Sequence, residues 1–400
     1  MRLDSPVLLL LALSVTSTAA ADADGILERA VADGRVPGVV AMVATVDEVI
    51  YAKAAGFADV EGQVPMREDS IFRIASMTKP VTSVAVMQLV ADGEVDLDAP
   101  VDRYLDDFTP KRVLLAVDDG QPSYSEATYV PTVRQLLSHT SGFAYGVWND
   151  RLLAITDLSS VSATSFIGEP LVFEPGTDWH YSTSTDWAGL IVERVSGLSL
   201  QDFFRRRITQ PLAMGDTGYD VDAASHGRVV TRHQRGVDGR LTELPNDPFR
   251  PATFYSGGAG LYSTAADYVR FMQMLLSEGG DDPRILPRAL VREMGQNQID
   301  GLEVGVMRTS LPAFSNDFDI YPDVPAKFGL GFLINERDLA GRRRAGSLTW
   351  GGLYNTYFWI DRDSGLCGVL LTQILPFYDG AVIDLLAEFE AAIYAHVAGR

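Results

Sequence analysis

The chain has 400 residues, enough for one large domain or two, and its hydrophobic fraction of 46% and charged fraction of 22% are ordinary for a globular protein. Its formal net charge of -20 makes phosphate backbones and anionic membranes poor partners, so we expect no nucleic-acid partner. Cys367 is the single cysteine, which excludes an internal disulfide.

The N-terminal segment, residues 1–21, predicts a secretory signal peptide. An apolar run from Val7 to Val15 is too short to span a bilayer, and Ala19 and Ala21 fit a small-residue cleavage site. Cleavage after Ala21 implies a periplasmic or secreted protein, whereas the alternative interpretation is a buried first helix. No later segment has 18 uninterrupted apolar residues, so we expect no stable membrane insertion.

The next elements are a strand pair and an interior helix. Residues 38–59 predict two strands that turn near Asp47 and Glu48. The stretch FRIASMTKPVTSVAV then opens a helix from Ser76 to Ala91 whose apolar positions cover most of its surface, which is typical of a helix buried on all sides. Ser76 would lie in the first turn, at the positive end of the helix dipole, with Lys79 on the same face one turn deeper.

This Ser-x-x-Lys pair predicts a nucleophile and its base. A serine hydroxyl is a weak nucleophile until a base takes its proton, and a lysine among apolar side chains can have its pKa lowered enough to do so. The chain has only four lysines and otherwise uses arginine, which keeps its proton. The spacing alone is weak evidence, with on the order of 0.3 chance occurrences expected. Its position at the start of an interior helix strengthens it, and the N–H of Ser76 could bind an oxyanion.

The remaining elements predict an α+β fold. Helices are expected at residues 132–139, 184–197, 264–280 and 381–397, and a strand hairpin at 354–373. We expect the early and late strands to form one antiparallel sheet flanked by helices, from residues of about 22–85 and 255–400, with a mostly helical lobe of about 86–254 inserted between them. A small-molecule pocket is expected between the two lobes of this 22–400 domain.

Several stretches resemble motifs of the serine β-lactamase and penicillin-binding-protein family, and most closely the family VIII carboxylesterases. The stretches are SMTK (76–79), LLSHTSGF (136–143), FEPGTDWHYST (173–183), PLAMGDTGY (211–219), GGAGLYSTAADYVRF (257–271) and TWGG (349–352). They fall in the order of the class C β-lactamase-like branch and cover nearly the whole mature chain. The resemblance implies a β-lactamase/transpeptidase-like fold.

The resemblance also implies the roles of individual residues. Ser76 takes the place of the family nucleophile, and Tyr181 that of the second-motif tyrosine, which helps Lys79 activate the serine and protonates the leaving group. TWGG takes the place of the third motif, so a backbone N–H of Trp350 or Gly351 would complete the oxyanion hole. Gly352 and its neighbour would let the backbone approach a ligand closely.

A further expectation concerns the pocket wall and the charge of the substrate. We expect Tyr145, Phe143 and Trp148 to form an apolar wall. Thr183 stands where β-lactamases of this branch have asparagine, and Trp350 where they have the lysine that helps to hold a substrate carboxylate. These departures favour a neutral ester over a β-lactam. Arg342, Arg343 and Arg344 could supply charge, although nothing in the sequence places them at the pocket.

We therefore expect a serine carboxylesterase that cleaves short-chain esters through an acyl-enzyme, with room for a weak β-lactamase side activity. The alternatives are a β-lactamase or a D-amino-acid peptidase or amidase of the same fold, and a non-catalytic protein that binds peptidoglycan or an acyl ligand. The partner would be a small-molecule ester or amide. The five histidines lack metal-ligand spacing, and no Gly-x-Gly-x-x-Gly follows a strand, so no metal or cofactor is implied.

Overall fold

The computed structural model describes residues 12–109, 111–245, 249–279 and 285–399, and the side chains from residue 22 onward. The first half of the predicted signal peptide, residues 1–11, lies outside the described residues. In these ranges the helices are α1 (Ala12–Ala32), α2 (Thr78–Ala91), α3 (Val133–Ser138), α4 (Asp150–Ile155), α5 (Ser184–Ser196), α6 (Leu200–Phe204), α7 (Ala265–Leu276), α8 (Arg288–Met294) and α9 (Gly380–Ala398). The helices expected from the sequence are present, with ends that differ by a few residues.

The strands form one large sheet and three small ones. They are β1 (Gly38–Ala44), β2 (Val49–Asp59), β3 (Val64–Pro65), β4 (Phe72–Arg73), β5 (Arg112–Asp118), β6 (Gln121–Glu126), β7 (Arg232–Arg235), β8 (Leu241–Leu244), β9 (Tyr262–Ser263), β10 (Ala326–Phe328), β11 (Leu333–Asn335), β12 (Leu348–Gly352), β13 (Thr356–Asp361), β14 (Leu366–Leu371) and β15 (Ile374–Leu375). The eight-stranded sheet has the order β10-β11-β12-β13-β14-β1-β2-β3. Its antiparallel β1–β14 pair joins the early and late strands, so the expected sheet is confirmed.

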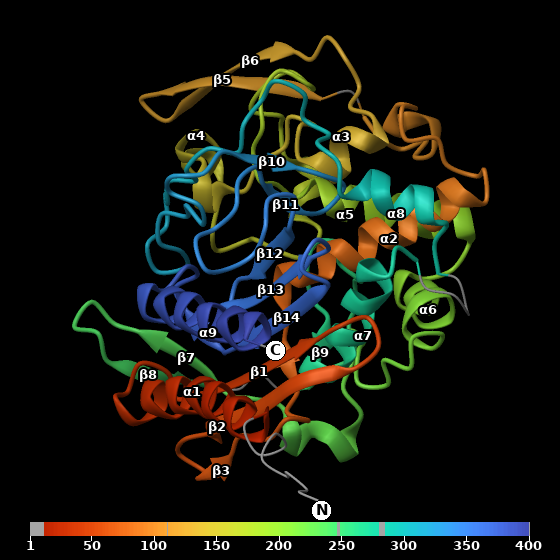
Figure 1. The fold of residues 1–400 in the computed structure, drawn as a ribbon. Helices are drawn as coiled ribbons and strands as arrows, with labels where there is room; N and C mark the ends of the chain where they lie inside the picture. Colours follow the sequence, from red (N-terminus) through yellow and green to blue (C-terminus); the bar gives the residue numbers. More distant parts are fainter. Residues whose placement is uncertain (1–11, 110, 246–248, 280–284, 400) are drawn as a thin grey trace, which may run out of the picture.

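Helices cover both faces of this sheet. Every residue of β1, β13 and β14 is buried, which requires cover on both sides. Side chains alternate along β13: Trp359 packs against Phe389 of α9, and Phe358 packs against Tyr268 of α7. Figure 1 shows α1 and α9 side by side across the front of the sheet. The terminal helices therefore cover the sheet as the sequence predicted.

Helix α2 lies in the interior, as its all-round apolar pattern predicted. Every residue from Thr78 to Leu89 is buried, and α2 packs against α5 and α6. The helix begins two residues later than expected, because Ser76 lies in a preceding 3₁₀ turn, η1 (Ala75–Met77). Ser76 is half-buried and Lys79 is fully buried. The turn sets the serine at the surface of a cavity while the lysine remains inside.

The segment expected to be mostly helical also contains strands. β5 and β6 form a hairpin at the top of Figure 1, and β7 and β8 join β15 in a three-stranded sheet. β15 pairs in parallel with β7, so residues 232–235 contact a strand from the C-terminal region. The division into two lobes stays a prediction, and its inserted part is more mixed than the sequence indicated.

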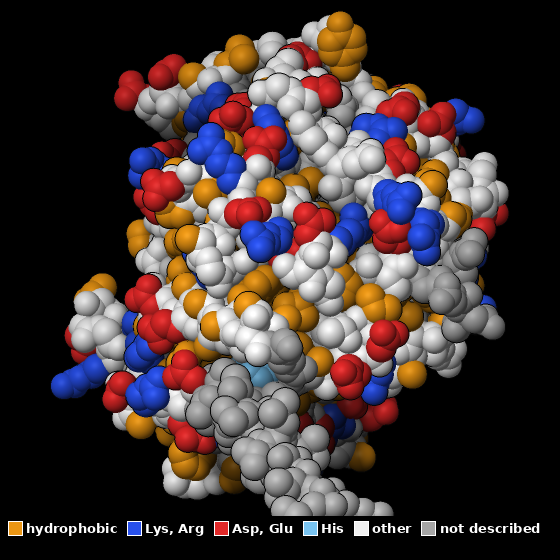
Figure 2. Space-filling model, viewed as in Figure 1, with side chains coloured by type: hydrophobic (Ala, Val, Ile, Leu, Met, Phe, Trp, Pro, Cys, Tyr) orange, Lys and Arg blue, Asp and Glu red, His pale blue; other side chains and the backbone are white. Residues whose placement is uncertain are grey.

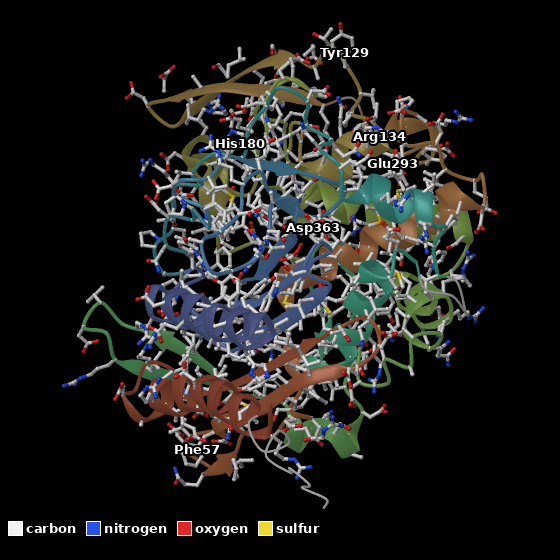
Figure 3. All side chains as sticks on the ribbon, viewed as in Figure 1. Phe57, Tyr129, Arg134, His180, Glu293 and Asp363 are labelled. Carbon is white, nitrogen blue, oxygen red and sulfur yellow. The ribbon has the colours of Figure 1, made fainter. Side chains whose placement is uncertain are left out.

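The described surface mixes charges, and no helix among the described residues is long and apolar enough to cross a membrane. Figure 2 shows acidic and basic side chains interspersed on the viewed face. Figure 3 shows Arg134 of α3 beside Glu293 of α8, where their side chains form a 3.0 Å ion pair.

Two arginines of the cluster, Arg343 and Arg344, form ion pairs within the protein. Arg343 is buried and forms an ion pair with Glu390 of α9, with Nη2 2.6 Å from Oε2. Arg344 pairs with Asp338 at 2.9 Å. Arg343 therefore ties the β11–β12 connection to the C-terminal helix. Its positive charge, which the sequence analysis considered for substrate binding, is paired with Glu390 instead.

We predict that Glu390→Ala lowers the free energy of unfolding by about 3–5 kcal/mol, because it leaves the Arg343 guanidinium buried and unpaired. The matched control on the same helix is Glu388→Ala. Glu388 is half-exposed and pairs with Arg35 at 3.0 Å, so its loss should cost about 0–1 kcal/mol. Urea unfolding of both variants measures the difference, and equal losses would contradict this role of the buried pair.

Candidate active site

A cavity of about 180 Å³ opens above the turn that carries Ser76, and we call it the Ser76 cavity. The residues from the sequence analysis that line it are Ser76, Tyr145, Trp148, Tyr181, Trp350 and Gly351. Phe314, Leu353 and Phe377 add apolar walls that the sequence analysis did not name. The structure thus brings six of the predicted site residues together from four separate parts of the chain.

The backbone before the nucleophile has an unusual conformation. Ala75 has a φ of +43°, in the left-handed region that non-glycine residues seldom adopt. Such conformations persist where the surrounding structure fixes them, often at functional sites. Here Tyr268 Oη donates to the Met77 carbonyl at 3.0 Å, and Ile74 N donates to the Leu261 carbonyl at 3.0 Å. These contacts hold the turn that directs Ser76 into the cavity.

The Lys79 side chain is held by three acceptors. Its Nζ donates to the Gly258 carbonyl at 2.8 Å, to Tyr145 Oη at 3.1 Å and to Ser76 Oγ at the longer distance of 3.4 Å. Nζ also lies 4.6 Å from the centre of the Tyr181 ring. With the carbonyl and the Tyr145 phenol taking two N–H groups, the remaining position on the nitrogen faces Ser76. This geometry places Ser76 Oγ on the open side of Lys79 Nζ.

Two tyrosines, rather than the single one expected, lie beside the lysine. Tyr181 presents its ring face to Lys79, and its Oη accepts a hydrogen bond from Trp350 Nε1 at 3.3 Å. Tyr145 supplies the hydroxyl that contacts Nζ. Burial raises the pKa of Tyr145 well above its ordinary value, so this phenol stays protonated at neutral pH. The catalytic role expected for Tyr181 stays a prediction, and Tyr145 is a second candidate for proton transfer.

Strand β12 approaches the serine turn at its C-terminal end. β11 pairs with Leu348 and Thr349 of β12, and residues 350–352 continue past it alongside η1. A Cβ on Gly352 would lie 2.3 Å from the Ile74 carbonyl oxygen, so only glycine permits this approach. Gly352 therefore sets the distance between strand and turn, while Trp350 and Gly351 line the cavity.

Two residues expected at the pocket lie elsewhere. Phe143 is fully buried and stacks on Trp187 with ring centres 5.8 Å apart, so it belongs to the interior and not to the cavity wall. Thr183 is buried, and its hydroxyl donates to Glu169 Oε2 at 3.3 Å. Burying a large ring against another ring is favourable, and a buried hydroxyl needs a partner, which explains both placements.

His139 is a buried residue with hydrogen-bond partners at the start of a neighbouring helix. It is buried at the end of α3, and its Nδ1 lies 3.0 Å from Ser182 Oγ and 3.1 Å from Ser184 Oγ. Burial lowers the pKa of His139 well below its ordinary value, so the ring is neutral. It ties α3 to the start of α5, next to Tyr181. No group of three or more His, Cys, Asp or Glu side chains that could hold a metal occurs within the described ranges.

A buried carboxylate behind the lysine escaped the sequence analysis. Asp186 Oδ1 accepts hydrogen bonds from Gly258 N at 3.0 Å and from Ser256 Oγ at 2.5 Å. The Gly258 carbonyl in turn accepts from Lys79, so Asp186 helps to fix the residue that holds the lysine. Burial raises the pKa of Asp186, and the charge of Lys79 opposes that rise. An aspartate in the first turn of a helix usually signals dipole stabilisation at a surface, which hides this role in sequence.

Glu169, which is partly buried, and Lys111, which is buried, are two further ionisable groups whose pKa values are shifted. Burial raises the pKa of Glu169 to about 7, and burial lowers the pKa of Lys111 to about 8. Lys111 Nζ donates to the Ile167 carbonyl at 2.6 Å and lies 4.9 Å from the centre of the Trp187 ring. The raised pKa means that the folded protein holds the Glu169 proton more tightly than the unfolded chain does.

We predict that Glu169 makes stability fall as the pH rises. Its contribution is fully present below the unfolded pKa of about 4.3 and is lost as the pH rises to about 7. Relative to Glu169→Gln, the native chain should lose on the order of 2–3 kcal/mol of unfolding free energy across this window. Lys111 titrates above the window, so it does not mask the effect.

Urea unfolding at a series of pH values measures this difference. Glu126→Gln, at an exposed position of β6, is the control and should keep the native pH profile. Parallel profiles for the native chain and Glu169→Gln would show that Glu169 is not protonated on folding.

The chain was compared with known proteins. The family description Beta-lactamase matches residues 23–393. Esterase EstB of Burkholderia gladioli is 33% identical, with 94% of this chain and 95% of the esterase covered. Acyltransferase calJ of Penicillium decumbens is 34% identical, with 86% of each chain covered. The LovD6 mutant of the simvastatin synthase LovD of Aspergillus terreus superposes with a TM-score of 0.84 at 29% identity, covering 99% of this chain and 100% of that chain.

Proposed function

This chain belongs to the beta-lactamase family, whose fold it shares, and from that premise we propose that it is a serine carboxylesterase that cleaves short-chain esters through an acyl-enzyme on Ser76. The observation that carries the proposal is the position of Lys79 Nζ, 3.4 Å from Ser76 Oγ and bound by a carbonyl and a phenol on its other sides. The chain is similar over most of its length to an esterase and to an acyltransferase, and this similarity supports chemistry on acyl groups.

The proposed reaction proceeds in two halves. Ser76 Oγ attacks the ester carbonyl carbon while its proton passes to Lys79 Nζ, and the N–H groups of Ser76 and of the Trp350–Gly351 segment bind the oxyanion. The C–O bond to the alcohol then breaks, and the proton on Lys79 passes to the leaving oxygen through a tyrosine hydroxyl. In the second half, water attacks the acyl carbon while Lys79 takes its proton. The bond from the acyl carbon to Oγ then breaks and Lys79 returns the proton to Oγ, which restores Ser76 and releases the acid.

The cavity supports a neutral, short substrate. Its volume of about 180 Å³ suits a small acyl group, and its walls beyond Ser76 are largely apolar and aromatic. Trp350 occupies the place of the third-motif lysine, and the arginines at 342–344 that could have replaced that charge lie elsewhere or in ion pairs. These features disfavour a β-lactam carboxylate, so a β-lactamase activity would be a weak side reaction.

Acyl transfer to an alcohol is a second candidate function. The same acyl-enzyme can react with an alcohol instead of water, and two of the similar proteins are an acyltransferase and a synthase by name. The aromatic walls around Ser76 support this candidate, because they favour an organic acceptor over water. Product analysis in the presence of a short alcohol separates the reactions, since transfer gives a new ester and hydrolysis gives the acid.

We also propose export through the segment 1–21. α1 runs past the expected cleavage point, and Ala23, Ile26, Leu27 and Ala30, in the part of α1 after Ala21, are buried. A mature chain starting at Asp22 would therefore keep these contacts. N-terminal sequencing of the protein purified from its natural compartment tests the proposal, and an uncleaved N-terminus would overturn it.

We predict that kcat/KM for p-nitrophenyl butyrate exceeds that for a chromogenic cephalosporin by at least about a hundredfold, or roughly 2.7 kcal/mol in barrier. The reason is the apolar cavity, which holds a neutral acyl chain and lacks a lysine for the cephalosporin carboxylate. Both values are measured on one preparation. A preference for the cephalosporin would contradict the esterase proposal.

We predict that Ser76→Ala lowers ester turnover by several orders of magnitude, as loss of a covalent nucleophile does. Lys79→Arg should be severely impaired as well, because arginine keeps its proton. Lys327→Arg is the matched control: Lys327 is also buried and donates to a carbonyl at 2.6 Å, outside the Ser76 cavity, so turnover should persist.

A fluorophosphonate probe distinguishes the non-catalytic alternative. The folded native chain should form an adduct on Ser76, detected by mass spectrometry of the digested protein. Folded protein without an adduct would favour a binding protein that keeps the fold alone.

A further inference from the structure

A second cavity adjoins the Ser76 cavity and has a different chemical character. Its volume is about 390 Å³, and it shares the walls Trp148 and Tyr181 with the Ser76 cavity. The two rings lie 5.4 Å apart at 62°, so they form the partition between the cavities. We call the second one the acidic cavity. Figure 3 shows His180, which lines it, in the upper left of the molecule near α4.

The charges that line the acidic cavity are mostly negative. Asp150, Asp178 and Glu303 contribute carboxylates from three separate segments. Arg308 is the one arginine or lysine among the described lining residues, and its guanidinium already pairs with Asp317 at 2.9 Å. Burial lowers the pKa of His180, so its ring is neutral at pH 7. The balance of charge facing the cavity is therefore negative.

The carboxylates are available to a ligand. Among the described residues, Asp150 and Glu303 form no ion pair. Asp178 Oδ1 accepts a hydrogen bond from Trp179 N at 2.8 Å, and its Oδ2 has the neutral His180 ring 3.5 Å away, so its charge is not balanced by a cation there. An acidic site without its own cations attracts a cation from outside.

Aromatic side chains on the same walls point to an organic cation. Trp148, Trp179 and Tyr181 all line the acidic cavity, and the face of an aromatic ring attracts a positive charge. Trp179 is 5% exposed, and its buried Nε1 has no hydrogen-bond partner among the described residues. Rings combined with carboxylates are a suitable environment for an ammonium group, and quaternary ammonium ions need ring faces rather than hydrogen-bond acceptors.

The position of the partition indicates which part of an ester would reach the acidic cavity. Tyr181 lies between the two cavities, beside Lys79, where the leaving alcohol takes its proton in the reaction proposed above. Phe314, Phe377 and Leu353 line the Ser76 cavity but not the acidic one, and they suit an acyl chain. The alcohol part of the ester would then extend past Tyr181.

Building on the proposed esterase function, we propose that the acidic cavity binds a cationic group on the alcohol part of the substrate, so that the enzyme selects esters of amino alcohols. The same cavity would hold the amino alcohol when it acts as acyl acceptor. Selection arises from Asp150, Asp178 and Glu303 together with the rings of Trp148 and Trp179.

The test compares butyrylcholine with 3,3-dimethylbutyl butyrate, two esters of the same shape that differ in one positive charge. We expect kcat/KM to favour butyrylcholine by at least about tenfold at low ionic strength and less at 1 M salt. In the triple variant Asp150→Asn, Asp178→Asn and Glu303→Gln, this preference should fall to about twofold or less. Turnover of the neutral ester should stay within about twofold, which also shows that the variant folds.

A charge-matched control separates local binding from long-range attraction. Asp33→Asn, Glu94→Gln and Asp102→Asn change three exposed carboxylates outside the acidic cavity and alter the net charge equally. This control should keep the preference for butyrylcholine. The cation site would be overturned if the native chain showed no preference for butyrylcholine, or if both triple variants lost the preference equally. The esterase proposal would still stand in either case, provided that p-nitrophenyl butyrate is turned over. Absence of turnover of all three esters would overturn both.

Discussion

The burial of a lysine amine in the middle of the protein is the constraint on which the site depends. An amine removed from water costs free energy unless its N–H groups find partners. Lys79 finds them in the Gly258 carbonyl and in Tyr145, and Asp186 fixes Gly258 from behind. Asp186 thus holds the residue whose carbonyl binds the lysine. The surrounding fold serves to keep this arrangement dry and fixed.

Glycines allow the backbone to close around that amine. A Cβ on Gly257 would lie 2.3 Å from the Thr185 carbonyl oxygen, and one on Gly258 would lie 2.7 Å from Asp186 Oδ2. Gly352 makes the equivalent approach between β12 and the serine turn. The glycines of the GGAG and TWGG stretches therefore permit close contacts with neighbouring segments, in addition to belonging to the motifs. Side chains at these positions would push α5 and β12 away from α2 and open the site to water.

The sequence predicted those parts of the fold whose pattern is local. The all-round apolar pattern of 76–91 and the strands that flank turns at 47–48 and 362–365 each appear where expected. The hairpin β5–β6 was missed because neither strand alternates apolar and polar side chains: β5 carries a continuous, partly buried apolar run, and β6 is polar and mostly exposed. Asp186 and Glu169 were missed for another reason: their burial is produced by segments far apart in the chain. Phe143 was misplaced because a loop sequence does not determine the direction of a ring.

The residues proposed to react and the residues proposed to contact a substrate lie in different kinds of structural element. Ser76 and Lys79 stand at the start of a helix locked into the core. The partition residue Trp148 ends a short 3₁₀ turn (Gly146–Trp148) in the connection between α3 and α4. This connection is fastened to another loop, with Trp148 Nε1 donating to Ser315 Oγ at 3.1 Å and the Val147 carbonyl accepting from Ser310 N at 2.7 Å. Loops tolerate sequence change far better than a core helix does. Evolution can therefore exchange the substrates of this scaffold by drift in two surface segments, while the reactive pair is inherited intact.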